Sequence, residues 1–205
     1  MNIWTTIARQ FGMPEGFLGR IAGYIMSNRS SNRERIEWAI YKLNVHTDDS
    51  ILEIGFGPGI AINIMSKMID VGHIVGLDHS SVMFKQAGKR NHESITSGKV
   101  RLYCDSIQNI KNYNFKFDKI LDINSFQFWD NRPAILNTLR YSLNNNGLIA
   151  IVHQPRKPGS TDRDAEEAGE KIAEDLRIAG YKNVTSCIKI MKPVSTVCVT
   201  GYKQD

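Results

Sequence analysis

The sequence lacks any apolar run close to the roughly 20 residues that a membrane-spanning helix requires. Its first residues, 1–10, also lack the basic and then apolar layout of a secretion signal. We therefore expect a soluble, cytoplasmic protein with no membrane partner. The apolar share of 41% in 205 residues is enough for a sizeable buried core.

Cysteine is scarce, with only Cys104, Cys187 and Cys198 in the chain. They are odd in number and widely separated, and no CxxC or Cys/His pair has the spacing of zinc ligands. We expect buried free thiols and no metal site.

No long run carries charge of one sign, because basic and acidic residues are interleaved. The net charge is +5, which permits nucleic-acid binding but does not favour it. The sequence contains no internal repeat and no low-complexity tract.

From residue 50 onward, β-branched runs alternate with helical patterns, which indicates βαβ units and a mostly parallel sheet. The predicted strands are residues 50–55, 73–78, 99–104, 117–123, 148–153, 183–191 and 194–202. The predicted helices are residues 60–68, 81–91, 133–143 and 162–179. Only Lys192-Pro193 joins the last two strands, which is too short for a parallel crossover. We therefore expect an antiparallel hairpin at one edge of a mixed sheet.

The segment before the first strand has a different pattern. Ile36, Ala39, Ile40 and Leu43 recur at helical spacing, and residues 21–26 repeat this step. We therefore predict a helical appendage over residues 1–46 and a ligand-binding α/β domain over residues 47–205.

A glycine-rich loop, Gly55-Phe56-Gly57-Pro58-Gly59, follows Glu53 and Ile54 between the first predicted strand and helix. Open α/β sheets bind ligands at this position. Glycines let a ligand approach the backbone closely, and the helix start offers free N–H groups. Asp78 ends the second strand about 20 residues further on, where a carboxylate can accept hydrogen bonds from ribose hydroxyls. The loop therefore predicts a site for a nucleoside-containing ligand.

A dinucleotide is the competing ligand for such a loop. The GxGxxG fingerprint would need a glycine at position 60, where this chain has Ile60. A nicotinamide-dependent oxidoreductase is therefore disfavoured, although it stays an alternative. A P-loop is excluded because no Gly-Lys-Ser/Thr ending is present.

On this motif the chain resembles the class I S-adenosylmethionine-dependent methyltransferases, from about residue 50 to the C-terminus. The resemblance implies a Rossmann-like, seven-stranded mixed sheet, in agreement with the predicted hairpin. It also implies S-adenosyl-L-methionine as cofactor. In that family Glu53 would orient the site, the glycine backbone would hold the methionine moiety, and Asp78 would bind the ribose.

Further positions carry over by their place in the family's pattern. Asp105, after strand three, would accept a hydrogen bond from the adenine amino group, beside Ile107. Asn124, after strand four, would meet the methionine ammonium or carboxylate. The residues expected to contact the cofactor are Glu53, Gly55, Phe56, Gly57, Gly59, Asp78, His79, Asp105, Ser106, Asn124 and Arg29.

The arginines before the first strand allow three interpretations. Glu34 and Glu37 alternate with Arg29, Arg33 and Arg35, so a solvated helix face is favoured over a phosphate-binding patch. Helices in this position of the family often cover the cofactor, and Arg29 would then pair with the methionine carboxylate.

Two features of the sequence concern the methyl acceptor. Phe126, Phe128 and Trp129 could form an aromatic wall for it, or pack beneath the next helix. His153, at the end of strand five, is the candidate general base, and a hydrogen-bonded histidine at a strand end is the alternative.

We expect a methyltransferase with a small-molecule acceptor. Asn124 does not continue into the Asn/Asp-Pro-Pro-Tyr/Phe motif of enzymes that methylate base amino groups, which argues against that activity. A methyltransferase acting on RNA or a peptide is the alternative, and it predicts a shared basic face. The residues of that face would be Lys85, Lys89, Arg90, Arg156 and Lys157. The sequence leaves the acceptor and the oligomeric state open.

Overall fold

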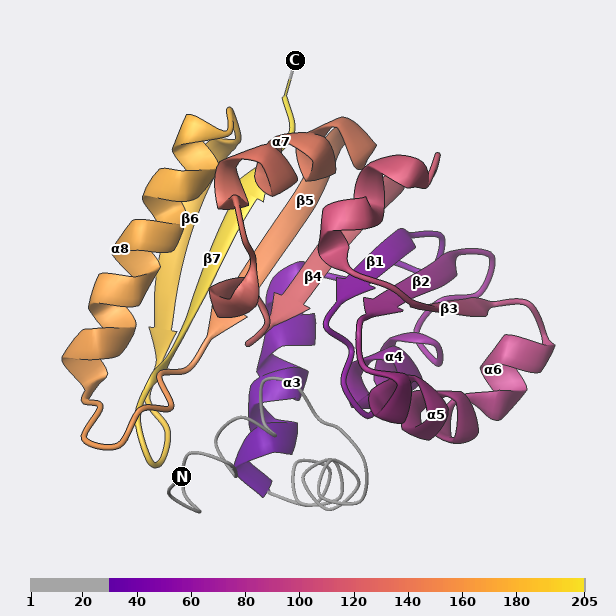
Figure 1. Ribbon diagram of the computed structural model, residues 1–205, viewed down its shortest axis with the longest axis horizontal. Coiled ribbons are helices and arrows are strands. Elements are labelled where there is room, and N and C mark those ends of the chain that lie inside the picture. Colours follow the sequence, from indigo (N-terminus) through magenta and orange to yellow (C-terminus); the bar gives the residue numbers. More distant parts are fainter. Residues whose placement is uncertain (1–29, 205) are drawn as a thin grey trace.

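The computed structural model describes residues 30–204, which form a sheet flanked by helices on both faces (Figure 1). The elements in chain order are α3 (Ser30–Leu43), β1 (Ser50–Ile54), α4 (Ile60–Met65), β2 (His73–Asp78), α5 (Ser81–Arg90), α6 (His92–Thr96), β3 (Val100–Cys104), η1 (Ile107–Asn112), β4 (Phe117–Ile123), η2 (Phe126–Phe128), α7 (Arg132–Ser142), β5 (Leu143–His153), α8 (Asp162–Ile178), β6 (Lys182–Lys189) and β7 (Thr196–Tyr202).

The sheet has seven strands in the order β3-β2-β1-β4-β5-β7-β6. The first five strands along the chain pair in parallel, while β7 is antiparallel to both β5 and β6. The strand order reverses beside β1, where β4 pairs on the side opposite β2. This topology confirms the predicted Rossmann-like mixed sheet with its C-terminal antiparallel hairpin.

Alternate residues of each strand point to opposite faces of the sheet, and each face has its own apolar core. Leu52 and Ile54 of β1 belong to the core that includes side chains of α7 and α8. Ile51 belongs to the second core, with side chains of α3 and α4. Helix α8 lies along β6 and β7 at one edge of the sheet, whereas α4 and α5 lie toward the edge formed by β3 (Figure 1).

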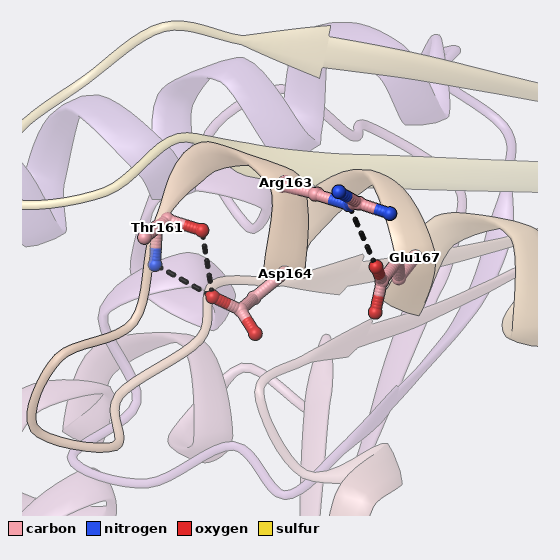
Figure 2. Close-up of polar contacts among 4 residues, drawn as sticks. All are labelled: Thr161, Arg163, Asp164 and Glu167. Atoms are coloured by element: carbon pink, nitrogen blue, oxygen red, sulfur yellow. Dashed lines mark hydrogen bonds and ion pairs between the residues drawn. The ribbon is translucent and has the colours of Figure 1, made fainter.

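The helix starts follow local chemistry. Ser80 caps α5, because its hydroxyl accepts a hydrogen bond from the backbone N–H of Met83. At the start of α8, the carboxylate of Asp164 accepts hydrogen bonds from the backbone N–H of Thr161 at 2.7 Å and from its hydroxyl at 2.9 Å (Figure 2). Arg163, in the same first turn, forms an exposed ion pair with Glu167 on the next turn (Figure 2). Pro133 lies in the first turn of α7, as predicted.

The structure differs from the predicted elements in several places, and the join between β6 and β7 is longer than predicted, because β6 ends at Lys189 and β7 begins at Thr196. Helix α4 ends at Met65 and does not continue to residue 68, because the chain turns there and the backbone N–H groups of Asp70 and Gly72 donate to the carbonyl of Thr47. Strand β5 begins at Leu143, which pairs with Phe117, and so includes residues 143–147, which lie before the predicted strand of residues 148–153. The short helices α6, η1 and η2 were not predicted.

Helix α3 buries Ile36, Ala39, Ile40 and Leu43, the four positions that the spacing indicated. It contacts α4, β4, β5 and β7, so it is part of the main core. The predicted helical step over residues 21–26 and Arg29 lie outside the described residues. The proposed division at residue 46 stays a prediction. Across residues 30–204, no helix has the length and apolarity needed to span a membrane.

Candidate active site

A cavity of about 420 Å³ lies where the parallel strands β1 to β4 end. Most of the sequence-predicted residues are brought together in its wall. Those that line it are Glu53, Gly55, Phe56, Gly57, Asp78, His79, Asp105, Ser106 and Asn124. Gly59 and His153 do not line it, and Arg29 is outside the described residues.

The glycines of the loop have different surroundings. Gly57 has a left-handed backbone with φ of +53°, and a Cβ added there would meet no atom within 4 Å. Its side of the loop therefore leaves open space beside the cavity. A Cβ on Gly55 would lie 2.4 Å from the Cβ of Ser125, and one on Gly59 would lie 2.7 Å from the Cβ of Ala87. A larger residue would therefore not fit at Gly55 or Gly59, because neighbouring elements pack closely against both positions.

Asp78 is held beneath the loop by two backbone N–H groups. Its carboxylate accepts hydrogen bonds from Gly57 and from Ser80, each at 2.8 Å. Burial raises the pKa of Asp78, and the two hydrogen bonds oppose this shift. These hydrogen bonds fix the Asp78 carboxylate in the cavity wall and connect it to the glycine loop.

Asp105 is held by three donors of its own segment. The backbone N–H of Ser106, the amide of Asn109 and the hydroxyl of Tyr113 donate to its carboxylate at 2.7, 2.7 and 2.8 Å. These hydrogen bonds, first that of Asn109, lower the pKa of Asp105. The side chain is therefore an ionised acceptor of fixed orientation in the cavity wall, and Ile107 lies beside it in the same wall.

Glu53 is a buried acid, 3% exposed, and its Oε2 atom has no hydrogen-bond partner among the described residues. Burial raises its pKa well above the ordinary value, and the charges of Asp78 and Asp122 raise it further. A buried carboxylate oxygen without a partner is costly. Glu53 can therefore accept a hydrogen bond from a cationic or donor group of a ligand.

Asn124 has a left-handed backbone, with φ of 61°, directly after β4. Its side-chain oxygen accepts a hydrogen bond from the backbone N–H of Gln154 at 2.7 Å. Its Nδ2 atom is buried and has no partner among the residues that the structure describes. The cavity thus presents a donor at the end of β4 and an acceptor, Glu53, at the neighbouring end of β1.

The candidate base His153 ends β5 and is half-buried. Burial lowers its pKa to about 4, and the charges of Arg156, Arg132 and Arg35 act in the same direction. The imidazole is therefore neutral near pH 7. Its role as a base stays a prediction, because the side chain does not line the cavity.

The aromatic residues after β4 were considered either as a wall for the methyl acceptor or as part of the core. Phe126 is buried and packs on Trp129 with the ring centroids 4.9 Å apart, so it belongs to the core. Phe128, which is 52% exposed, and Trp129 both line the cavity. Trp129 is 6% exposed and belongs to the same core as Phe126, so of the three residues only Phe128 is both exposed and part of the cavity wall.

Helix α3 adds residues that were not among the cofactor contacts expected from the sequence. Asn32, Arg35 and Ile36 line the cavity. The prediction of a solvated arginine face holds for Arg33, which pairs with Glu37 at 2.8 Å, and is wrong for Arg35, which is 3% exposed. The spacing held the signal, because Arg35 precedes Ala39 by one helical turn on the apolar stripe.

The fold and the site together define a class of enzyme. A methyltransferase-domain family profile matches residues 51–147. The chain is 31% identical to the uncharacterized methyltransferase YdaC of Bacillus subtilis over 183 residues, which is 89% of this chain and 98% of that protein. The chain therefore belongs to the class I S-adenosylmethionine-dependent methyltransferases, and the resemblance seen in its motifs is confirmed.

Solved structures show the same fold at low sequence identity. The N-methyltransferase NodS from Bradyrhizobium japonicum, determined with S-adenosylhomocysteine, has a TM-score of 0.69 at 12% identity, and all of both chains is covered. A SAM-dependent methyltransferase from Aquifex aeolicus has a TM-score of 0.68 at 16% identity, with 85% of this chain and 94% of that chain covered. The sequence-predicted alternative of a nicotinamide-dependent oxidoreductase is set aside by this family membership.

Proposed function

We propose that this enzyme transfers a methyl group from S-adenosylmethionine to a small-molecule acceptor bound in the same cavity. The observation that carries the proposal is the cavity itself. Its volume of about 420 Å³ is in the range of small-ligand sites, about 300–1,000 Å³. Residues of helix α3 line this cavity together with Phe128 and Trp129, which suits a small acceptor.

The residues of the cavity fit the proposed cofactor. Glu53 offers an acceptor atom and Asn124 a donor atom, each buried and without a partner among the described residues. A methionine end carries an ammonium and a carboxylate, which match these two groups. The open space at Gly57 admits close approach of a ligand to the backbone.

The nucleoside end would lie toward β2 and β3. Asp78 uses its oxygens for two backbone N–H groups, and each carboxylate oxygen can accept a further hydrogen bond, here from a ribose hydroxyl. Asp105 would accept from the adenine amino group, with Ile107 against the ring. His79 and Ser106 lie beside these two acids in the cavity wall.

Methyl transfer from a sulfonium is an in-line displacement, and S-adenosylmethionine supplies the methyl group. The task of this chain is to orient the acceptor and to exclude water from the reacting atoms. Phe128 and Trp129 can stack on a flat acceptor or attract a cationic one. A neutral amine or a thiolate then needs only positioning, whereas a hydroxyl needs a base, for which His153 is the candidate.

Calorimetry with S-adenosylhomocysteine tests the cofactor site. We expect binding to the wild-type enzyme and a loss of at least about tenfold in affinity in Asp78→Ala, because the ribose acceptor is removed. Retained affinity in Asp78→Ala would remove this residue from the site, and no binding to the wild type would reject the proposed function.

Labelled-methyl transfer to a cell extract, split into small-molecule, peptide and RNA fractions, tests the acceptor class. We expect label in the small-molecule fraction. Salt-sensitive labelling of RNA would favour the nucleic-acid alternative. Of the basic residues considered for that alternative, Lys85, Lys89 and Arg156 are all exposed, and Arg156 also lines the cavity.

A further inference from the structure

Arg35 is a buried cation that has no counter-charge among the residues the structure describes. It is 3% exposed, and its guanidinium donates to the side-chain oxygen of Gln154 at 2.5 Å and to that of Asn32. Within residues 30–204, its Nε atom has no hydrogen-bond partner and Arg35 makes no ion pair. A buried charge that lacks an opposite charge is strongly unfavourable. An anionic ligand would supply what this site lacks.

A second arginine adds positive charge at the same end of the cavity. Arg156 lines the cavity together with Arg35. Burial, and to a smaller extent the charge of Arg156, lower the pKa of Arg35 to about 9. We call these two residues the cationic end of the cavity. The carboxylates of Glu53, Asp78 and Asp105 line the same cavity, so both signs of charge face one ligand site.

The cationic end is held in place by a chain of hydrogen bonds. Gln154, buried after β5, receives the Arg35 hydrogen bond and donates its side-chain N–H to the carbonyl of Val194 at 2.6 Å. Its backbone N–H donates to Asn124. A guanidinium fixed before binding loses little side-chain entropy when it binds an anion, and its fork matches the oxygens of a carboxylate or phosphate.

We propose that the methyl acceptor carries an anionic group, a carboxylate or a phosphate, and that Arg35 and Arg156 bind it. This inference rests on the proposed function. The arginines come from α3 and from the segment after β5, whereas the glycine loop follows β1, with β4 between β1 and β5 in the sheet. The cofactor has one carboxylate, and for it Asn124 offers a donor that has no partner among residues 30–204, so a second anion accounts for the buried charge of Arg35.

Anion binding to the enzyme saturated with S-adenosylhomocysteine tests the proposal. Inorganic phosphate and acetate are titrated separately by calorimetry, which separates the two anion classes. We expect one of them to bind, and Arg35→Gln to weaken it by about tenfold or more. Arg33→Gln is the matched control, because it removes the same charge from the same helix at an exposed position. We expect the control to change binding by less than about twofold.

Arg156→Gln is the second variant, so that the test does not depend on the folding of a protein altered at buried Arg35. We expect Arg156→Gln also to weaken anion binding, with the affinity for S-adenosylhomocysteine changed by less than about threefold in each variant. Failure of both anions to bind the wild-type enzyme would overturn the proposal. Equal effects of the Arg33, Arg35 and Arg156 variants would also overturn it.

The competing role is recognition of the cofactor's own carboxylate. In that case Arg35→Gln would weaken S-adenosylhomocysteine by about tenfold but leave 5′-methylthioadenosine, which lacks the carboxylate, unchanged. This pattern would overturn the proposal while leaving the proposed function intact. If S-adenosylhomocysteine does not bind the wild type, the proposed function fails, and the same phosphate and acetate titrations without it still decide whether Arg35 and Arg156 form an anion site.

Discussion

Gly57 and Gly98 share a left-handed backbone, with φ of +53° and +78°, and in neither case would an added Cβ meet an atom within 4 Å. They differ in place, because Gly57 lines the cavity and Gly98 precedes β3. Substitutions at these two positions should therefore strain the backbone equally, whereas only the substitution at Gly57 should affect a ligand in the cavity.

We predict that Gly57→Ala and Gly98→Ala each lower the free energy of unfolding by about 1 kcal/mol, because L-residues avoid this backbone region. Only Gly57→Ala should weaken S-adenosylhomocysteine, by about tenfold or more, because its methyl group fills the space beside the loop. Urea unfolding and calorimetry measure the two effects. Equal affinities of the two variants would show that the cofactor does not approach Gly57.

His153 can be tested by its pH dependence once an acceptor has been found. As general base it would act in its neutral form, so kcat should fall as the pH drops through about 4, the value to which burial and three arginines lower its pKa. His153→Gln should then lower kcat by about 100-fold and remove this fall. A loss of less than about tenfold, with the pH profile unchanged, would assign His153 to structure alone.

At the scale of elements, the start of α8 shows how local contacts set a helix boundary (Figure 2). Asp164 accepts two hydrogen bonds from Thr161 across the first turn, whereas the ion pair of Arg163 with Glu167 is exposed and lies within the helix. A helix cap contributes more to stability than an exposed ion pair.

We predict that Asp164→Ala lowers Tm by roughly 2–4 °C, because an unpaired N–H group is left at the helix start. Glu167→Ala, the matched control on the next turn, should lower Tm by less than about 1 °C. Differential scanning calorimetry measures both values. A larger effect of Glu167→Ala would mean that the ion pair, and not the cap, stabilises this end of α8.

Helix α3 contributes a residue to the site, Arg35, that was not expected there from the sequence. Its pattern predicted a helix with one apolar face, and that face is buried as expected. Arg35 lies on the same face and reaches Gln154, which is 119 positions away in the chain. Because the partner surface comes from so distant a segment, the helix pattern gave the helix but could not show that its arginine enters a cavity.

At the scale of the whole molecule, several acidic side chains of and near the site are buried inside the fold. Glu53, Asp78 and Asp122 are all buried acids with raised pKa values. Burial raises the pKa of Asp122 from 3.8 to about 7, and hydrogen bonds from Ser125 and Phe126 oppose the shift. Folding therefore favours the neutral form of Asp122, and stability is linked to pH through this group.

We predict that the stability contributed by neutral Asp122 is fully present below pH 3.8 and is lost as the pH rises through about 7. Asp122→Asn stays neutral and keeps an oxygen for the backbone N–H of Phe126. The variant should therefore gain stability relative to the wild type, on the order of 2 kcal/mol between pH 4 and pH 8. Urea unfolding at several pH values measures this difference, and parallel pH curves for the two proteins would contradict the prediction.

The sequence by itself determined the α/β class, the C-terminal hairpin, the glycine loop and the acids Glu53, Asp78 and Asp105 at one edge. Strand and helix periods are local signals, and the carboxyl ends of parallel strands necessarily meet at the same edge of a sheet. The resemblance to methyltransferases rested on these local features, and the structure confirms the predicted sheet with its C-terminal hairpin.

Only the tertiary structure decided which of the predicted residues meet in a cavity. Gly59 packs against α5, His153 lies off the cavity wall, and Arg35 is buried beside Gln154. Each of these outcomes depends on the surface that a distant segment brings to the residue, and no local pattern encodes that surface. The sequence shows which side chains are charged. Whether a charged side chain is buried, and therefore needs a partner, depends on how the elements pack together.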